Sequence, residues 1–474
     1  MTRVAALIAV VALAAWFASG AWVRRSQSSS LPALPERAST LAPVWDAMAA
    51  ADAQARSQPA SAAAVGALGK AYQAALLSSL AERVYAVAER LEPADPQWPY
   101  YRALLFAERG NHVAADEALR RVTSLDASHA LAWLHLADLR LKDGRSDDAH
   151  SAYRRAAAAP QPQPFMIGGK VARRGLAVSS YAEAGVQRLV QESDGELSGQ
   201  GRQPTAYVPP ADPWVDDVVA RSQHPDLLLK HAALAARGGD QAWREFLVRR
   251  ALAVSPRGFD VLLEAASMLQ ASGRHSEAVE YLRQAEAVAP DDHHTLVEQG
   301  KSLTELGRLD EAEQVLRRAI RVRDAVAEYN LGVVLDRQDR WDEARTHYQR
   351  ALAIDPFHAR SLNNLASGLD RRGQSDTVLG LYQRALRASP DLAEAHSNFG
   401  TALINRRRFS EAIGALEQAV ALDPRAADAQ NNLGIALAQV GRIVEARRAF
   451  EQALQLAPRH ANARRNLEAL TLTP

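Results

Sequence analysis

The sequence of 474 residues contains no cysteine, and its 56 Lys and Arg almost balance its 55 Asp and Glu. Without cysteine the chain has no disulfide framework, no Cys-ligated zinc or iron–sulfur cluster and no thiol nucleophile. The net charge of +1 argues against a bulk electrostatic affinity for nucleic acid or acidic membranes. The length alone predicts about three globular domains, unless the chain is built from internal repeats.

The first 25 residues differ from the rest of the chain. The segment from Val4 to Val23 carries no charge, and Arg3, Arg24 and Arg25 flank it. It is long enough to span a bilayer, which takes about 20 apolar residues. We expect residues 1–25 to be either a cleaved signal peptide or an uncleaved anchor that crosses the membrane through residues 4–23. If the segment stays in the membrane, Arg24 and Arg25 favour a cytoplasmic position for the residues that follow, whereas a signal-like start favours export. We expect export, and hence a body in the cell envelope, periplasmic or otherwise extracytoplasmic, that is either anchored or released.

Residues 26–61 are predicted to be a tether between this segment and the body. A serine-rich run from Ser26 to Ser30, together with prolines such as Pro32 and Pro59, opposes packing. Within the tether, Leu41 to Ala55 is rich enough in alanine to form a short helix.

The remainder of the chain repeats a pattern of 34 residues. Pro356, Pro390, Pro424 and Pro458 follow one another at this spacing, and each comes just after a helical stretch that its ring would end. A glycine near the middle of most repeats, for example Gly307, indicates a turn between two helices. The first helix carries a large apolar residue followed by a small one, and the second carries two alanines seven apart. Such knobs and holes let the two helices pack closely.

These features resemble the tetratricopeptide repeat. The first repeat shows the pattern in seven residues: Leu68, Gly69, Tyr72, Ala81, Tyr85, Ala88 and Pro93. Ten repeats begin near the following residues: Ala62, Pro96, Ala130, Pro225, Phe259, His293, Ala325, Ala359, Ala393 and Ala427. The resemblance implies an all-α solenoid in which helix-turn-helix repeats coil into a right-handed superhelix, and it implies a protein-binding role.

The repeats are predicted to form two arrays. Residues 62–159 hold three repeats, residues 225–460 hold seven, and residues 461–474 are predicted to be a capping helix and tail. Residues 160–224 separate the arrays, and they are the part of the body in which the repeat pattern fails.

Two features stand out within residues 160–224. Phe165 to Val190 fits a degenerate repeat, and Ser193 to Pro213 is rich in Gly, Ser and Pro, which is typical of a linker. A short apolar stretch after it is expected to start a helix that caps the second array; its residues are Trp214, Val215, Val218 and Val219.

No catalytic, metal-binding or cofactor-binding site emerges from the sequence. Gly300-Lys301-Ser302 ends like a phosphate loop, but Thr295 stands where that motif needs glycine, and no strand precedes it. His293-His294 is the only adjacent pair of histidines, and no acidic third ligand stands at a suitable spacing. Carboxylates such as Asp310-Glu311 recur in the first turn of second helices, where they complement the positive helix end. We therefore predict a protein that is not an enzyme and that takes no cofactor, metal, nucleic acid or small-molecule substrate.

A row of asparagines is the polar feature that exceeds this background. Its members lie 34 residues apart, each just before the large-small pair of a first helix: Asn330, Asn364, Asn398, Asn432 and Asn466. An amide carries both donor and acceptor, so it can bridge the N–H and C=O of an extended peptide without reading its sequence. The row resembles the asparagine ladder of the O-linked N-acetylglucosamine transferases, which lines a concave surface and holds peptide backbone. That resemblance covers the repeats only. The alternative is an inert, solvated row copied by duplication.

These observations predict a non-enzymatic adaptor of the cell envelope that binds an extended segment of a partner protein in the concave groove of the solenoid. The asparagines are expected to hold the backbone of that segment, while Tyr329, Asn363 and Arg360 set the preference for side chains. The alternative is a structural scaffold of an envelope assembly, such as a machine for polysaccharide export or cytochrome maturation. Such a scaffold would use convex faces and helix ends in place of the groove.

Overall fold

The computed structural model describes residues 30–37, 40–160, 165–167, 170–173, 178–193, 212–373 and 377–472. The expected signal or anchor segment, residues 1–25, lies outside them. Among the described residues, no helix combines the length and the apolar character that a membrane crossing requires.

The chain divides into two compact bodies. We refer to Met1–Met268 as the N-terminal body and to Leu269–Pro474 as the C-terminal body, and each is considered by itself. The sequence placed the division in residues 160–224, whereas the boundary between the bodies lies inside helix α13. The reason is that the end of the 160–224 segment packs back onto the first repeats, as described below.

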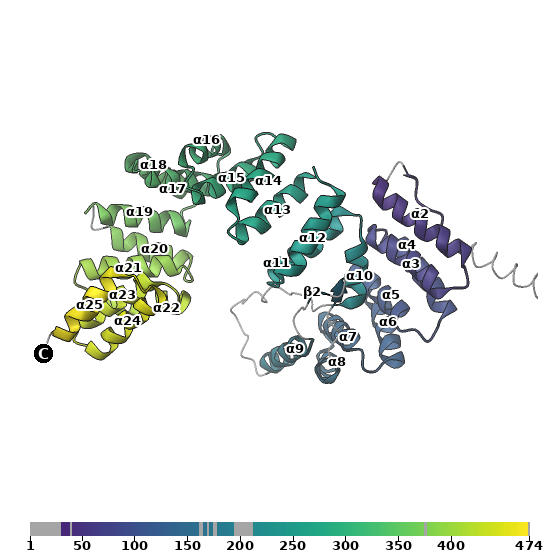
Figure 1. The fold of residues 1–474 in the computed structure, drawn as a ribbon. Coiled ribbons are helices and arrows are strands. Elements are labelled where there is room, and N and C mark those ends of the chain that lie inside the picture. Colours follow the sequence, from purple (N-terminus) through teal and green to yellow (C-terminus); the bar gives the residue numbers. More distant parts are fainter. Residues whose placement is uncertain are drawn as a thin grey trace, which may run out of the picture. The chain divides into compact units, whose positions relative to one another are not determined.

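The N-terminal body is a stack of paired helices (Figure 1). Its helices are α2 (Ala42–Ser57), α3 (Ala62–Ala74), α4 (Ser78–Leu91), α5 (Gln97–Glu108), α6 (His112–Leu125), α7 (Ala130–Lys142), α8 (Ser146–Ala158), α9 (Val178–Ser193), α10 (Pro213–Arg221), α11 (Pro225–Arg237), α12 (Gln241–Val254) and most of α13 (Phe259–Ala271). Helices α3 and α4 pack together as the first repeat, and α5 with α6, α7 with α8 and α11 with α12 follow the same scheme.

The C-terminal body continues the pairing. Its helices are α14 (His275–Val288), α15 (His293–Glu305), α16 (Leu309–Ala319), α17 (Ala325–Arg337), α18 (Trp341–Ile354), α19 (Ala359–Arg371), α20 (Val378–Ala388), α21 (Ala393–Asn405), α22 (Phe409–Leu422), α23 (Ala427–Gln439), α24 (Ile443–Leu456) and α25 (Ala461–Leu472). First helices of both bodies begin at, or one residue from, the positions where the 34-residue pattern starts a repeat. The predicted all-α solenoid of helix-turn-helix repeats is therefore confirmed.

Glycines on the first helices are the holes into which large side chains of the second helices fit. A Cβ atom added at Gly332 would lie 2.7 Å from Cε1 of Tyr348, and one at Gly69 would lie 2.5 Å from Cε1 of Tyr85. Real Cβ atoms do not approach other atoms so closely, so only glycine permits the observed helix spacing at these positions. The large-small pairs of the sequence thus mark the contact between the two helices of a repeat.

The turn between the two helices needs a residue in the left-handed region. Gly307 has φ of 71° and Gly441 has φ of 81°, whereas the equivalent positions of two other repeats hold Asp339 and Arg407, both with φ of 60°. A side chain in this region costs about 1–2 kcal/mol, a cost that glycine avoids. We expect Arg407→Gly to raise the free energy of unfolding by about 1 kcal/mol, measured by urea denaturation. Gly441→Arg is the matched control, and an equal effect of both changes would contradict this account.

Residues 31–37 and 40–57 contain side chains that pack onto the first repeats, so the predicted tether is wrong for these ranges. Helix α2, which confirms the expected helix at Leu41–Ala55, packs on α3. Leu31 is buried in the same apolar cluster as Val44 and Met48 of α2. Trp45 donates from Nε1 to the backbone oxygen of Pro35 at 3.0 Å, which ties the preceding loop to the helix. The prolines therefore shape a docked loop, and apolar side chains between them supply the packing.

The predicted degenerate repeat at Phe165–Val190 is wrong in its first half. Strands β1 (Phe165–Ile167) and β2 (Lys170–Arg173) form an antiparallel pair there, with Met166 opposite Val171 and Ile167 opposite Lys170. Gly168 and Gly169 stand between the two strands in the sequence, and a Gly-Gly pair favours a two-residue hairpin connection over a helix. The second half is helix α9, which packs on α7 and α8 as the first helix of a further repeat would.

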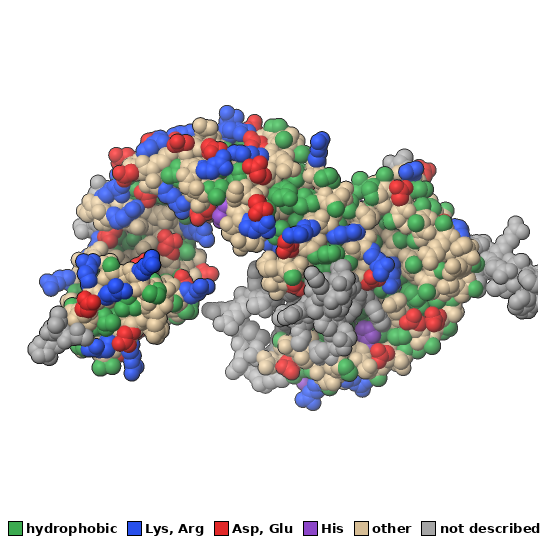
Figure 2. Space-filling model, in the orientation of Figure 1, with side chains coloured by type: hydrophobic (Ala, Val, Ile, Leu, Met, Phe, Trp, Pro, Cys, Tyr) green, Lys and Arg blue, Asp and Glu red, His purple; other side chains and the backbone are tan. Residues whose placement is uncertain are grey.

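Charged side chains of both signs are interspersed over the visible face of the molecule (Figure 2). One kind of charged pair recurs at the start of second helices, where an arginine just before the helix binds a glutamate three residues later. The pairs are Arg274–Glu277, Arg308–Glu311, Arg340–Glu343, Arg408–Glu411 and Arg442–Glu445. Hydrogen bonds from the arginines lower the pKa of the paired glutamates. These acidic residues thus have a local role at helix starts.

Candidate functional site

The asparagine row lies on first helices of the C-terminal body. Helix α19 contacts α21, α21 contacts α23, and α23 contacts α25, so these first helices lie side by side (Figure 1). Within the described part of this body, the second helices of neighbouring repeats contact one another less extensively. A stack curves toward the side on which its elements approach most closely. We therefore call the surface formed by α17, α19, α21, α23 and α25 the inner face.

On the inner face, the asparagines of neighbouring repeats are joined through a buried amide. Nδ2 of Asn398, on α21, donates to Oδ1 of Asn363, on α19, at 3.1 Å. Asn363 in turn donates from Nδ2 to Oδ1 of Asn364 at 3.1 Å and to Oε1 of Glu394 at 3.2 Å. Asn363 is only 1% exposed, while Asn364 and Asn398 are half-buried. The buried amide thus orients two half-exposed ones.

The same arrangement recurs two repeats later. Nδ2 of Asn466, on α25, donates to Oδ1 of Asn431, on α23, at 3.0 Å. Asn431 is 4% exposed and donates to Oδ1 of Asn432 at 3.1 Å. Asn432 also donates to Oγ1 of Thr401, on α21, at 3.0 Å. Together with the first arrangement, these bonds link α19, α21, α23 and α25 along the inner face.

Asn330 stands apart from this network. Its Nδ2 donates to the backbone oxygen of Val326, one turn earlier in the same helix, at 2.8 Å. In the row predicted from the 34-residue spacing, Asn398, Asn432 and Asn466 therefore bond to a neighbouring repeat, whereas Asn364 and Asn330 bond within their own helices.

Of the three residues expected to set side-chain preference, the structure places two at the inner face. Tyr329 is half-buried, with its ring centroid 6.1 Å from that of Tyr348 and 5.2 Å from that of His358. Burial raises the pKa of Tyr329, and the positive charge of Arg360 opposes the rise. Arg360 itself is exposed. The expectation for Asn363 is wrong, because a side chain so deeply buried is not available to a partner.

Asn431, Thr401 and Glu394 complete the network. The predicted row contains one asparagine per repeat and does not include these three residues. A signal for Asn431 was present, because the pair Asn363-Asn364 recurs as Asn431-Asn432 at twice the repeat length. Thr401 and Glu394 each make one bond in the network, and this bond has no counterpart in the other described repeats. A repeating pattern in the sequence therefore does not identify them.

The row retains hydrogen-bonding capacity toward a ligand. An amide offers two N–H donors and an oxygen with two lone pairs. The bond from Asn398 to Asn363 uses one N–H of Asn398, and the bond that Asn364 accepts from Asn363 uses one lone pair. The half-buried amides thus present neutral groups that can both donate and accept hydrogen bonds. Such groups suit the backbone of a peptide.

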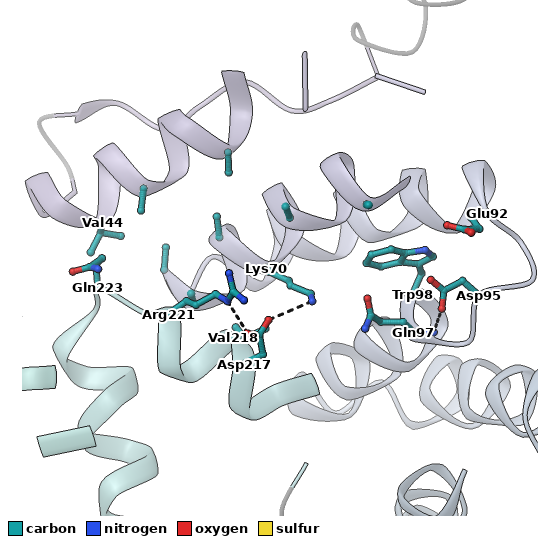
Figure 3. A pocket seen from close by; sticks show the side chains of 17 residues that line it. Val44, Lys70, Glu92, Asp95, Gln97, Trp98, Asp217, Val218, Arg221 and Gln223 are labelled. Carbon is teal, nitrogen blue, oxygen red and sulfur yellow. Dashed lines mark hydrogen bonds and ion pairs between the residues drawn. The ribbon is translucent and has the colours of Figure 1, made fainter. Parts of the chain in front are cut away.

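The N-terminal body contains a cavity of about 510 Å³ (Figure 3). Alanines of α2 and α3 form much of its wall, with Trp98 of α5 and Val218 of α10. Asp217 lies at its edge and pairs with Lys70 at 3.5 Å and with Arg221 at 2.6 Å, as Figure 3 shows. The cavity is therefore largely apolar, with Lys70, Asp217 and Arg221 on one part of its rim and Glu92 and Asp95 near Trp98 (Figure 3).

Helix α10, which forms part of this wall, was expected to cap the second array. The helix is present, but it packs on α3 of the first repeat as well as contacting α11. Val218 is buried in the same cluster as Val44 and Trp98. Oγ of Ser222 donates to the backbone oxygen of Ala74 at 2.8 Å, which fastens the end of α10 to the end of α3. The expected position is therefore corrected, because Val218 finds its apolar partners in the first repeats.

Comparison with known proteins identifies the repeats. One tetratricopeptide-repeat model matches residues 323–391, and a second matches residues 102–164, 263–328 and 397–461, so that the matches cover more than half of the chain. Among curated proteins, none matches.

Solved structures with similar folds include the following three. The Cut9–Hcn1 hetero-tetramer of APC/C is 15% identical over 90% of this chain and 86% of that chain, with a TM-score of 0.47. Yeast Tom70 is 16% identical over 86% and 95%, with a TM-score of 0.41. A tetratricopeptide repeat protein from Parabacteroides merdae is 15% identical over 52% and 98%, with a TM-score of 0.42.

Proposed function

The chain belongs to the tetratricopeptide-repeat family, and from this premise we propose that it is a non-enzymatic adaptor that binds an extended segment of a partner protein on the inner face of the C-terminal body. Repeats of this family generally mediate protein–protein interactions. The observation that carries the more specific proposal is the bonded row of half-buried amides from Asn364 to Asn466.

The row suits an extended backbone for two reasons. Packed helices lie about 8–10 Å apart, a distance that an extended chain spans in about three residues. Each repeat can therefore contact one peptide group in every three residues of the bound segment. The buried Asn363 and Asn431 hold the exposed amides in place before a ligand arrives. Such preorganisation removes part of the entropy cost of binding.

We place this adaptor in the cell envelope, on the basis of the uncharged segment from Val4 to Val23. N-terminal sequencing of the protein purified from its own cells distinguishes a cleaved signal peptide from a retained anchor. We expect added protease to digest the body in spheroplasts and to leave it intact in cells with an intact envelope. Protection of the body in spheroplasts would contradict an extracytoplasmic location.

The binding proposal is tested with a photo-crosslinking amino acid in the full chain, in cells. It is placed at Arg360 on the inner face or at Gln349, an exposed residue of a second helix. We expect a protein adduct from Arg360 and little from Gln349. The reverse result would favour the scaffold that uses convex faces.

The amides themselves are tested by a matched pair of variants. Asn398→Ala and Asn363→Ala both remove the bond between these two residues, and Asn363→Ala also removes the bonds to Asn364 and Glu394. We therefore expect Asn398→Ala to lower the free energy of unfolding by about 1 kcal/mol and Asn363→Ala to lower it by about 2–3 kcal/mol. Only Asn398 is exposed enough to touch a ligand. We expect Asn398→Ala to lower the yield of the Arg360 adduct about tenfold and Asn363→Ala to lower it much less. Equal losses would mean that the row serves packing alone.

A further inference from the structure

The position of the asparagine row also exists in the first three repeats, where other residues occupy it. It lies five residues after the start of each repeat and holds Ala67 on α3, Tyr101 on α5 and His135 on α7. These three first helices form a face that corresponds to the inner face of the C-terminal body.

All three positions lie near one segment of the same chain, residues 212–223, which contains α10. Ala67 lines the cavity together with Val218. Burial and the negative charges of Asp212 and Asp217 raise the pKa of Tyr101. The ring centroid of His135 lies 6.0 Å from that of Tyr100, whose hydroxyl bonds to Asp212. Burial lowers the pKa of His135, and the charge of Asp212 opposes this shift. The row position of the N-terminal body therefore faces a peptide segment that the chain itself supplies.

The contacts at the start of this segment are polar and specific. The hydroxyl of Tyr100 donates to Oδ2 of Asp212 at 2.5 Å, in a buried environment. Oδ1 of Asp212 also accepts from the backbone N–H of Val215 at 3.2 Å, and Asp216 accepts from the backbone N–H of Asp212 at 3.1 Å. Both carboxylates are buried. The face thus holds the segment through Asp212, the carboxylate just before α10, while Asp212 and Asp216 also bond to backbone N–H groups at the start of the helix, where the helix dipole favours negative charge.

The apolar side chains of the segment fill only part of the space between it and the first repeats. Val218 and Val219 are buried, yet the cavity of about 510 Å³ lies beside Val218. The alanines of α2 and α3 leave this space open, and it is large enough for side chains bigger than valine (Figure 3).

We propose that the face formed by α3, α5 and α7 is a second peptide-binding site, and that residues 212–223 occupy it until a partner helix displaces them. The partner is a short helix that begins with carboxylates and presents apolar side chains larger than valine. This site does not depend on the asparagine row, so the failure of either proposal leaves the other standing.

The test uses fluorescein-labelled peptides of residues 211–223 and measures their binding to the full chain by fluorescence anisotropy. One receptor is the unaltered chain, and the other carries Asp212→Asn with Val218→Asp, which weakens the internal segment. We expect the peptide to bind the altered chain at least tenfold more tightly. A peptide with Val218→Leu should bind about fourfold more tightly than the original peptide, because one methylene enters the cavity. A peptide with Asp212→Asn should bind more weakly than the original.

Tyr100→Phe in the altered receptor tests the carboxylate contact, because it removes the hydroxyl and keeps the ring. We expect it to weaken peptide binding several-fold, whereas Tyr281→Phe in the C-terminal body should not change it. If the altered receptor shows a native circular dichroism spectrum and binds none of the peptides, or binds all of them equally, the proposal is overturned.

A second measurement covers the case in which the altered receptor unfolds. Hydrogen exchange of residues 212–223 is followed in the unaltered chain with and without an excess of the Val218→Leu peptide. Displacement predicts faster exchange of these amides when the peptide is present. Unchanged exchange at saturating peptide would refute the proposal.

Discussion

Phe450→Ala is expected to lower the free energy of unfolding by about 3–5 kcal/mol. Phe450 lies on α24, is 2% exposed and belongs to the core cluster that includes Leu433 and Leu437 of α23. Its ring fills the space above Gly434, where an added Cβ would lie 2.6 Å from Cε1 of the ring. Two packed helices cannot collapse fully into the space of a lost ring, so a cavity remains. Because neighbouring repeats are coupled, hydrogen exchange of α23 and α24 is the measurement that localises the loss.

Gly434→Ala tests the same contact from the opposite helix. In the unaltered chain the new methyl group meets the Phe450 ring, so we expect a loss of about 1–3 kcal/mol. When Phe450 is already alanine the obstacle is gone, and alanine should stabilise the helix by about 0.5–1 kcal/mol relative to glycine. Gly434→Ala should thus lower the free energy of unfolding when Phe450 is present and raise it when residue 450 is alanine. Additive effects of the two changes would contradict the knob-and-hole contact.

Phe357→Ala is the matched control for the lost ring. Phe357 stands between α18 and α19 and is 76% exposed. Since its ring already lies in water, its removal should change the free energy of unfolding by no more than about 0.5 kcal/mol. A large effect here would mean that the loss at Phe450 does not report burial.

The repeats could be predicted from the sequence because each is defined by contacts within about 34 residues. Proline and glycine mark helix ends and turns through their own backbone restrictions, and these marks recur. The marks are not obligatory, as Asp339 and Arg407 show at turns where glycine is usual. These repeats could still be located, because the repeat pattern also includes the large-small pair, the paired alanines and the proline.

The position of α10 could not be predicted in this way. Ser222 and Ala74, which form a hydrogen bond, are 148 residues apart, and a contact made once leaves no period. The composition of residues 193–213 indicates that the repeat pattern stops, but not where the chain packs next. The same holds for Leu31, whose burial depends on a single docked loop.

The asparagine row was predicted in its positions but not in its bonding. The 34-residue period identified Asn364 and Asn398, whereas their link through Asn363 depends on which side of α19 each residue faces. Successive residues of a helix point about 100° apart, since a turn takes 3.6 residues. Asn363 is buried and Asn364 half-exposed for this reason, a difference that spacing alone did not decide.

Glu264→Ala is expected to destabilise the N-terminal body by about 3–5 kcal/mol. Glu264 occupies the row position on α13, and its Oε1 accepts from Nε of Arg244, on α12, at 2.9 Å. Arg244 is 5% exposed and also donates from Nη2 to Oγ of Ser267 at 3.0 Å. Without the carboxylate, the guanidinium stays buried beside a hydroxyl that cannot neutralise its charge. The melting temperature measured by circular dichroism should fall accordingly.

Two further variants separate the charge from the packing. Arg244→Met combined with Glu264→Leu removes both charges and keeps apolar volume, so it should recover most of the stability that Glu264→Ala loses. Glu411→Ala removes the partner of Arg408 in an exposed pair and should leave the melting temperature nearly unchanged. Equal effects of Glu264→Ala and Glu411→Ala would contradict the buried pair. With Arg244 beneath it, the row position at residue 264 requires a negative charge, and this explains why the asparagine row does not extend to this repeat.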